Sequence, residues 1–139
     1  MRKIVFLSLL ITSLLIASCS SVSKEDLTHL KGYWEINSVK SRGEVFSPKG
    51  AAPAVDHYTF INDSMGYKKK MVPSFGDNYT SSEDKVPFKI ITKRGDFFLE
   101  FNAPLEVWEE KIESLSPDEL VLFHKDNSYH YHRHQKINY

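Results

Sequence analysis

Beyond its first 26 residues the chain alternates apolar and polar positions with a period of two, as strands with one buried face do. Turn-forming residues separate the alternating runs, as at Asn62-Asp63, Arg94-Gly95-Asp96, Ser116-Pro117-Asp118 and Asp126-Asn127. The pattern predicts eight short strands, near 33–40, 56–62, 65–72, 86–93, 96–102, 105–115, 119–125 and 128–135. Antiparallel strands joined by hairpins hide their edges by closing, so the pattern favours an all-β, eight-stranded antiparallel up-and-down barrel.

Three stretches depart from this alternation. Ser23-Lys24-Glu25-Asp26 has the form of a capping box, and it predicts a short N-terminal helical turn that Gly32 ends. Residues 41–54 and 73–84 are rich in Gly, Pro and Ser, and they are predicted as long loops. Loops of this length in a small β domain either shape a functional site or reflect surface variation.

The first residues have the form of a bacterial export signal. A basic start precedes an apolar run of about 13 residues, short of the roughly 20 that span a bilayer. Ile16-Ala17-Ser18-Cys19 resembles the bacterial lipobox, whose cysteine becomes the lipidated first residue of the mature protein. The resemblance implies a signal peptide at 1–18, a lipidated Cys19 and tether at 19–26, and a folded domain at 27–139. An ordinary signal peptide that contains a cysteine is the alternative.

The expected location is therefore the bacterial cell envelope, with the acylated cysteine as the membrane anchor. Ser20 stands where an aspartate would resemble an inner-membrane retention signal, which favours the outer membrane. The polar stretch that follows resembles the tags of surface-exposed lipoproteins, so the domain faces either the periplasm or the cell surface.

Composition narrows the functional classes. The 139 residues allow one globular domain, and 41% of them are hydrophobic, enough for a packed core. Lys plus Arg and Asp plus Glu both number 18, so no net positive charge attracts nucleic acid and we expect no nucleic-acid partner. The single cysteine excludes internal disulfides and multi-cysteine zinc sites. Since the sequence also lacks catalytic and phosphate-binding motifs, we expect no enzyme activity and no cofactor.

Two segments resemble a known superfamily. Leu30–Ile36, which contains Gly32-Tyr33-Trp34, resembles the Gly-x-Trp signature that opens the first strand of lipocalins and other calycins. Trp108–Leu122 is similar to the late hairpin of small lipocalin-like lipoproteins. The resemblance implies an eight-stranded barrel with Trp34 pointing inward and a hollow that often holds a hydrophobic small molecule.

If Trp34 points inward, alternation assigns a strongly aromatic set of side chains to the barrel interior. These candidate ligand-binding residues are Trp34, Tyr58, Phe60, Phe88, Phe97, Leu99, Phe101, Trp108, Ile112, Leu122 and Tyr131. The same face also includes Ile36, Ser38, Val86 and Ile90. The first hypothesis is a carrier of a small hydrophobic or amphipathic molecule. The rival hypothesis is a filled barrel that acts through its loops as an envelope interaction or assembly module.

A polar group is expected inside the last two hairpins. A turn at Asp126-Asn127 pairs His124 with Tyr129, and Glu110 lies opposite His124. The same register places Ser114 opposite Leu120, Leu122 opposite Tyr131 and Leu120 opposite Arg133. Glu110, His124 and Tyr129 either solvate a wet rim, contact a ligand head group or form an acid–base pair.

Arg133 is expected near Trp34, because the last strand of a closed barrel lies beside the first. This matches the calycin pattern in which a late basic residue packs over the signature tryptophan and closes one end of the barrel. The alternative is that Tyr131 and Arg133 bind a ligand carboxylate, although their order is reversed from the Arg-x-Tyr pair of fatty-acid-binding proteins.

Three histidines alternate along the last strand. His130, His132 and His134 share the outer face, where neighbours lie about 7 Å apart and can share an ion. The outer two are about 13 Å apart, too far to bind one zinc ion together, so no metal site is assigned.

The charge run Lys68–Lys70 is expected on a solvated face or at a sheet edge.

Overall fold

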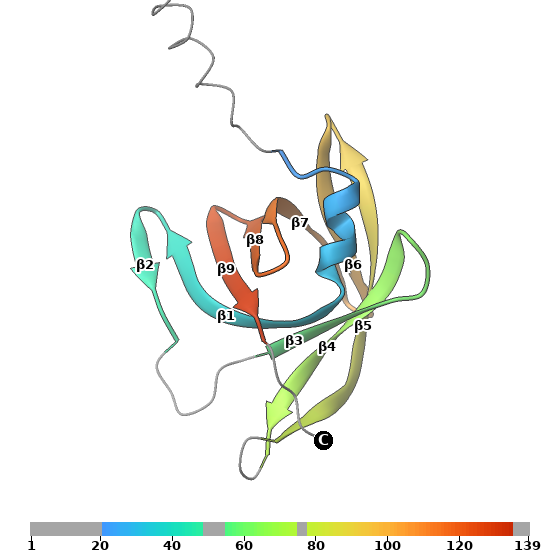
Figure 1. Ribbon diagram of the computed structural model, residues 1–139, viewed down its shortest axis with the longest axis vertical. Coiled ribbons are helices and arrows are strands. Elements are labelled where there is room, and N and C mark those ends of the chain that lie inside the picture. The colour runs from blue at the N-terminus through green and yellow to red at the C-terminus, as the bar shows by residue number, and fades with distance from the viewer. Residues whose placement is uncertain (1–20, 49–54, 75–77, 135–139) are drawn as a thin grey trace, which may run out of the picture.

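The chain forms an antiparallel β-barrel covered at one end by a short helix, in a computed structural model that describes residues 21–48, 55–74 and 78–134 (Figure 1). The elements within these ranges are the 3-10 helix η2 (Glu25–Leu30) and the strands β1 (Gly32–Ser41), β2 (Glu44–Phe46), β3 (Val55–Phe60), β4 (Met65–Pro73), β5 (Tyr79–Lys93), β6 (Asp96–Ala103), β7 (Glu106–Leu115), β8 (Glu119–His124) and β9 (Asn127–Arg133). In this part of the chain, β1 and β3 to β9 pair in order, and β1 also pairs with β9, which closes a ring of eight strands. The predicted eight-stranded antiparallel barrel is confirmed.

The two ends of the barrel differ. At one end, which we call the helix end, lie η2, the start of β1 and the β3–β4, β5–β6 and β7–β8 turns. At the opposite end, which we call the far end, lie the β1–β2, β6–β7 and β8–β9 turns. The chain therefore enters the barrel through the helix that covers it.

The helix η2 plugs the helix end of the barrel. Ser23 and Asp26 form the predicted capping box: the Ser23 N–H donates to Asp26 Oδ2 at 2.8 Å, and the Asp26 N–H donates to Ser23 Oγ at 3.2 Å. The bonds from Ser23 hold the pKa of Asp26 below its ordinary value because they stabilise the carboxylate. Leu27 and Leu30 are buried and join the same apolar cluster as Trp34. The predicted helical turn is therefore part of the core.

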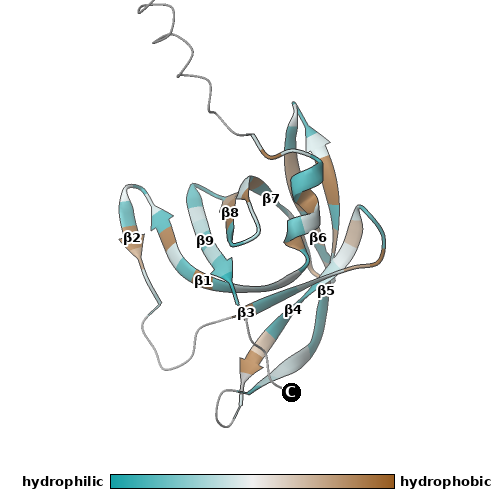
Figure 2. Cartoon of the chain, viewed as in Figure 1, coloured by the Kyte–Doolittle hydropathy of each residue, from teal (hydrophilic) through white to brown (hydrophobic). Residues whose placement is uncertain are grey.

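Two strands occupy stretches that the sequence predicts as loops. β2 lies within the predicted loop 41–54, and its three residues are all exposed. β5 begins at Tyr79, inside the predicted loop 73–84, and its first residues pair with the end of β4. β2 and the end of β4 carry the hydrophobic colour in Figure 2. Alternation fails at β2 because no face of it is buried, and in β5 because a bulge at Ser82–Asp84 breaks the register.

The predicted register of the last hairpin is wrong by two residues. The turn is Lys125–Asp126, whose φ angles are 47° and 65°, and not Asp126–Asn127. Two residues with positive φ match the right-handed twist of the flanking strands, as in a type I′ turn. The observed pairs are His124 with Asn127, Leu122 with Tyr129 and Leu120 with Tyr131, while Arg133 pairs with Trp34. A shift of two keeps every side chain on its predicted face.

Bulges interrupt two strands for which strict alternation was assumed. The register of β1 against β9 shifts between Ile36 and Ser38, and that of β7 against β8 shifts between Ile112 and Ser114. Each extra residue exchanges the faces of the residues after it. The inward positions therefore go to Val39 in place of Ser38 and to Leu115 in place of Ser114, which no longer lies opposite Leu120.

Candidate functional site

Aromatic and aliphatic side chains fill much of the barrel axis. Seven of the predicted lining residues are at most 3% exposed: Trp34, Tyr58, Leu99, Phe101 and Leu122 at 0%, Ile112 at 2% and Phe88 at 3%. Phe60, Phe97, Trp108, Tyr129 and Tyr131 are partly buried against them. The ring centres of Phe101 and Trp108 stack 5.0 Å apart, and Phe88 meets Phe101 edge-on at 6.0 Å. A ligand contact at these residues stays a prediction.

Arg133 closes the helix end. Its guanidinium carbon lies 4.0 Å from the centre of the Trp34 ring. Its three nitrogens donate to backbone carbonyls: Nε to Pro117 at 2.9 Å, Nη1 to Lys31 at 2.7 Å, and Nη2 to His29. These bonds tie β9 to η2 and to the β7–β8 turn. The geometry therefore supports the structural interpretation of Arg133 over carboxylate binding together with Tyr131.

Gly32 makes room for this arrangement. Its φ is +120°, and a Cβ atom there would lie 2.6 Å from Nη1 of Arg133. Any other residue would push the guanidinium off the carbonyls that it binds. The Trp34 indole N–H completes the closure by donating to the Leu30 carbonyl at 2.8 Å. Both named residues of the Gly-x-Trp segment, Gly32 and Trp34, therefore contribute to closing the helix end in this chain.

Glu110, His124 and Tyr129 do not form a hydrogen-bonded triad among the described residues. Glu110 accepts a hydrogen bond from the Trp108 indole N–H at 3.0 Å. Nδ1 of His124 lies 2.8 Å from the backbone oxygen of Glu109. Tyr129 lies opposite Leu122, and not opposite His124 as predicted. The partners of Glu110 and His124 are thus structural, and ligand contact through these residues stays a prediction.

Asp56 and Lys68 lie on the inward face of their strands, although no site role was predicted for Asp56 and Lys68 was expected on a solvated face or at a sheet edge. Asp56 is 8% exposed, and burial raises the pKa of its carboxyl, an effect that the charge of Lys68 opposes. The hydroxyl of Tyr58 is buried without a hydrogen-bond partner among the described residues, and burial raises its pKa. Nζ of Lys68 lies 4.4 Å from the centre of the Phe101 ring, so this lysine does not belong to a solvated face. The alternation that places Tyr58 inward also places Asp56 there.

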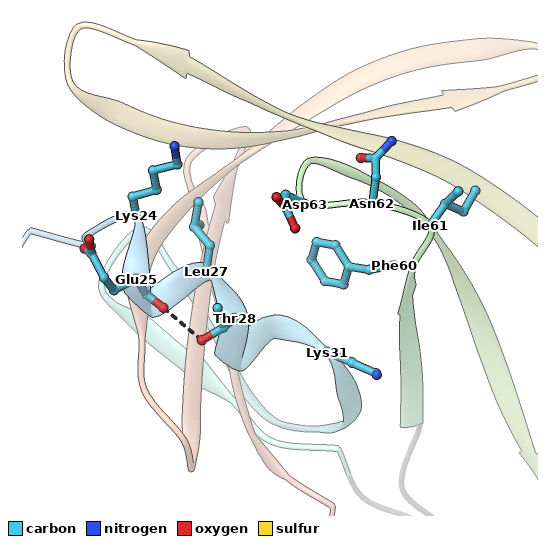
Figure 3. A pocket seen from close by; sticks show the side chains of 9 residues that line it. All are labelled: Lys24, Glu25, Leu27, Thr28, Lys31, Phe60, Ile61, Asn62 and Asp63. Atoms are coloured by element: carbon cyan, nitrogen blue, oxygen red, sulfur yellow. Dashed lines mark hydrogen bonds between the residues drawn. The ribbon is translucent and has the colours of Figure 1, made fainter.

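A cleft of about 720 Å³ opens at the helix end, between η2 and the β3–β4 turn (Figure 3). The ring of Phe60 of β3 points toward η2, the helix that carries Leu27 (Figure 3). The residues that line this helix-end cleft are Lys24, Glu25, Leu27, Thr28, Lys31, Phe60, Ile61, Asn62 and Asp63. Two bases and two acids balance around an apolar floor. Only Phe60 was predicted to bind a ligand, because strand alternation does not reveal the surface that a helix adds.

Local hydrogen bonds fix both walls of the helix-end cleft. Asn62 Oδ1 accepts from the N–H groups of Ser64 at 3.0 Å and Met65 at 2.9 Å, and the Ile61 N–H donates to the Met65 carbonyl at 2.8 Å. Side-chain bonds of this kind stabilise a tight turn. On the other wall, the Thr28 hydroxyl donates to the Glu25 carbonyl at 2.8 Å. Hydrogen bonds between side chains and the neighbouring backbone therefore hold both walls in place.

A second cleft, of about 530 Å³, lies where the chain enters the helix end. It is lined by Ser21, Val22, Asp96, Phe97, Lys111, Ile112, Glu113, Ser114, Val121 and His130. It is smaller than the helix-end cleft. Of the predicted ligand-binding residues, it includes Phe97 and Ile112.

Two of the three predicted outer-face histidines, His132 and His134, lie beside the Glu35 carboxylate on the outside of the barrel. Nδ1 of His134 is 2.8 Å from Oε2 of Glu35, and Nε2 of His132 is 3.5 Å from Oε1 of the same residue. Glu119 of β8 lies opposite His132 of β9. Within the described residues, no three His, Cys, Asp or Glu side chains are arranged to hold a metal ion. We therefore propose no metal site at these histidines.

Cys19 and the predicted signal peptide at 1–18 lie outside the described residues. Among the residues that are described, no helix has both the length and the apolar character needed to cross a bilayer.

No protein-family model and no curated protein sequence matches this chain. A crystal structure of a lipocalin-like protein from Bacteroides uniformis is similar, with a TM-score of 0.49 and 13% identity over 76% of this chain and 99% of that one. The fold assignment rests on the strand pairing, and this distant likeness adds no functional argument.

Proposed function

We propose that this chain is a non-enzymatic, lipid-anchored protein of the bacterial cell envelope that binds a small amphipathic molecule in its helix-end cleft. The volume of that cleft carries the proposal, since about 720 Å³ lies within the roughly 300–1,000 Å³ of typical small-molecule sites. The anchor is Cys19, which the lipobox resemblance supports, and Ser20 favours the outer membrane.

The lining of the helix-end cleft suits a molecule with one apolar and one polar part. Leu27 and Phe60 offer an apolar floor, and Lys24, Lys31 and Asp63 offer charged partners. The barrel axis is a poorer candidate because the side chains along it bury one another almost completely. We therefore place the ligand beside η2, with its apolar part against Phe60 and its polar part at the charged rim.

Ligand extraction and a cleft-blocking variant test this proposal. The full chain is purified from its membrane, and the bound molecules are identified by native mass spectrometry and organic extraction. Binding is then measured with N-phenyl-1-naphthylamine, a neutral dye that fluoresces in apolar sites, and by displacing the dye with dodecanoate and a lysophospholipid. Thr28→Trp fills the cleft and is expected to weaken dye binding at least about tenfold.

Thr80→Trp is the matched control, because Thr80 is also exposed but lies on β5, near the far end. It is expected to bind the dye like the unmodified chain. A folded chain that yields no bound molecule and binds neither the dye nor its competitors would refute the carrier proposal. Equal binding by both tryptophan variants would show that the ligand site lies elsewhere.

A second candidate function is an interaction or assembly module with a filled barrel. The specific observation in its favour is a set of large apolar side chains exposed near the far end, among them Leu105 at 99% and Val107 at 62%. Exposed apolar surface is a feature of protein contact sites. This candidate predicts that Leu105→Ser abolishes co-purification of an envelope protein and leaves dye binding unchanged.

A further inference from the structure

The β3–β4 turn exposes two large apolar side chains at the helix end. Ile61 is 72% exposed and Met65 is 48% exposed. The hydrogen bond between the Ile61 N–H and the Met65 carbonyl holds the two residues side by side. Figure 3 shows Ile61 on the outer side of the turn, pointing away from the Phe60 ring. We call Ile61 and Met65 the apolar tip.

The apolar tip lies at the end of the barrel where the described chain begins. Val22 packs against the core cluster that includes Leu27, and Ser21 lines the second cleft beside it. Cys19 precedes Ser21 by two residues, which span at most about 7 Å when fully extended. An acylated Cys19 would therefore hold the end of the barrel at which Ser21 lies, the helix end, close to the bilayer.

The charges at the helix-end cleft neither drive nor oppose this approach. Lys24 and Lys31 are balanced by Glu25 and Asp63 among the residues that line it. Attraction to anionic lipids needs an excess of basic residues, so it adds little here. The free energy of an approach would come from removing the apolar tip from water.

We propose that the apolar tip, Ile61 and Met65, rests in the interface of the bilayer that holds Cys19, so that the helix-end cleft opens onto the membrane surface. This inference rests on the anchoring part of the proposed function. The arrangement makes a lipid of that membrane the occupant of the cleft, with its acyl chain against Phe60. The far end, with the exposed Leu105, then points away from the membrane.

The single cysteine makes a sharp test possible. Acylation consumes the thiol of Cys19, so Ile61→Cys and Leu105→Cys each introduce one reactive thiol on a hairpin turn or beside it, at opposite ends of the barrel. Each full-length variant is produced in bacteria, labelled with the environment-sensitive fluorophore NBD, and reconstituted into phosphatidylcholine vesicles that contain spin-labelled lipid. Because both positions are exposed, unchanged thermal unfolding is expected and serves as the folding control.

NBD at position 61 is expected to be quenched at least about twice as strongly as NBD at 105, with a blue-shifted emission and no dependence on salt concentration. Met65→Cys, labelled in the same way, is expected to behave like the variant at 61. Equal quenching at both ends, or stronger quenching at 105, would overturn the docking proposal and leave the anchor intact. Labelling of the unmodified chain would show that Cys19 is not acylated, and it would overturn the anchoring proposal together with the docking proposal.

Discussion

Replacing Arg133 by alanine removes the contacts that hold η2 and the β7–β8 turn to the last strand. Three charge-assisted hydrogen bonds to backbone carbonyls are lost, each contributing about 1 kcal/mol at a partly exposed site. The loss of the cation over the Trp34 ring, 4.0 Å away, costs about 1 kcal/mol more. We expect Arg133→Ala to lower the free energy of unfolding by about 4 kcal/mol.

Arg133→Lys separates the two contributions. Lysine keeps the positive charge over Trp34, but its single ammonium group cannot reach the carbonyls of His29, Lys31 and Pro117 together. We expect this variant to lose about 2 kcal/mol, half of the loss in the alanine variant. Arg94→Ala, in the exposed β5–β6 turn, is the control and is expected to change stability by less than about 0.5 kcal/mol.

Urea unfolding, followed by far-ultraviolet circular dichroism and tryptophan emission, measures these differences. With an m value of about 1.5 kcal/mol/M, the alanine variant is expected to unfold at a urea concentration about 2.5 M lower than the unmodified chain. A loss below about 1 kcal/mol in Arg133→Ala would refute the closing role of Arg133. Equal losses in the lysine and alanine variants would show that the charge over Trp34 contributes nothing.

Three further changes have expected outcomes that the same unfolding assay checks. Gly66→Ala places a Cβ atom 2.0 Å from the Thr59 carbonyl oxygen and is expected to lower the free energy of unfolding by at least about 3 kcal/mol. In the control, Gly95→Ala, the new Cβ atom meets no atom within 4 Å, and the positive φ alone is expected to cost about 1 kcal/mol. Equal losses in the two variants would contradict the clash at Gly66. Tyr58→Phe removes a buried hydroxyl that has no partner among the described residues and is expected to be neutral or to stabilise by up to about 1 kcal/mol, so a clear loss would indicate a hidden partner. Burial raises the pKa of Asp56 above its ordinary 3.8, so the protonated carboxyl favours folding below about pH 4 and that contribution is lost as pH rises through the folded pKa. Asp56→Asn is therefore expected to be more stable than the unmodified chain at pH 7, with the gain shrinking toward pH 4, and a gain independent of pH would refute this.

The sequence predicted the barrel because the property that closes it, alternation with turns at short intervals, is written along each strand. It also predicted that Arg133 lies near Trp34, since any closed ring brings the last strand beside the first. The predicted register of the last hairpin is wrong by two residues because several adjacent pairs of polar residues near Asp126 can form a turn. Only the backbone preference for positive φ decides among them.

The candidate site was less accessible to sequence reasoning. Alternation assigns faces to strands, and it placed Tyr58 and Phe101 correctly in the interior. It does not show whether an interior is hollow, which depends on how large side chains from different strands interlock. The helix-end cleft arises between a helix and a turn that are about 30 residues apart, as Leu27 and Phe60 illustrate. No periodic pattern within a segment of the sequence indicates a contact between two such distant elements.

The pairing of β1 with β9 determines when this protein can fold. Trp34 and Arg133 lie opposite each other although about 100 residues separate them in the sequence, so the ring closes only after a long loop has been ordered. A chain that is exported from its N-terminus emerges with β9 last, and until then β1 presents an unpaired edge on which other chains can add strands. If the chain is exported, as the proposed function requires, folding is therefore expected to follow export and not to accompany it. A chain that stops before residue 127 would leave the edge of β1 that pairs with β9 without a partner, and it would form an open, aggregation-prone sheet in place of a smaller barrel.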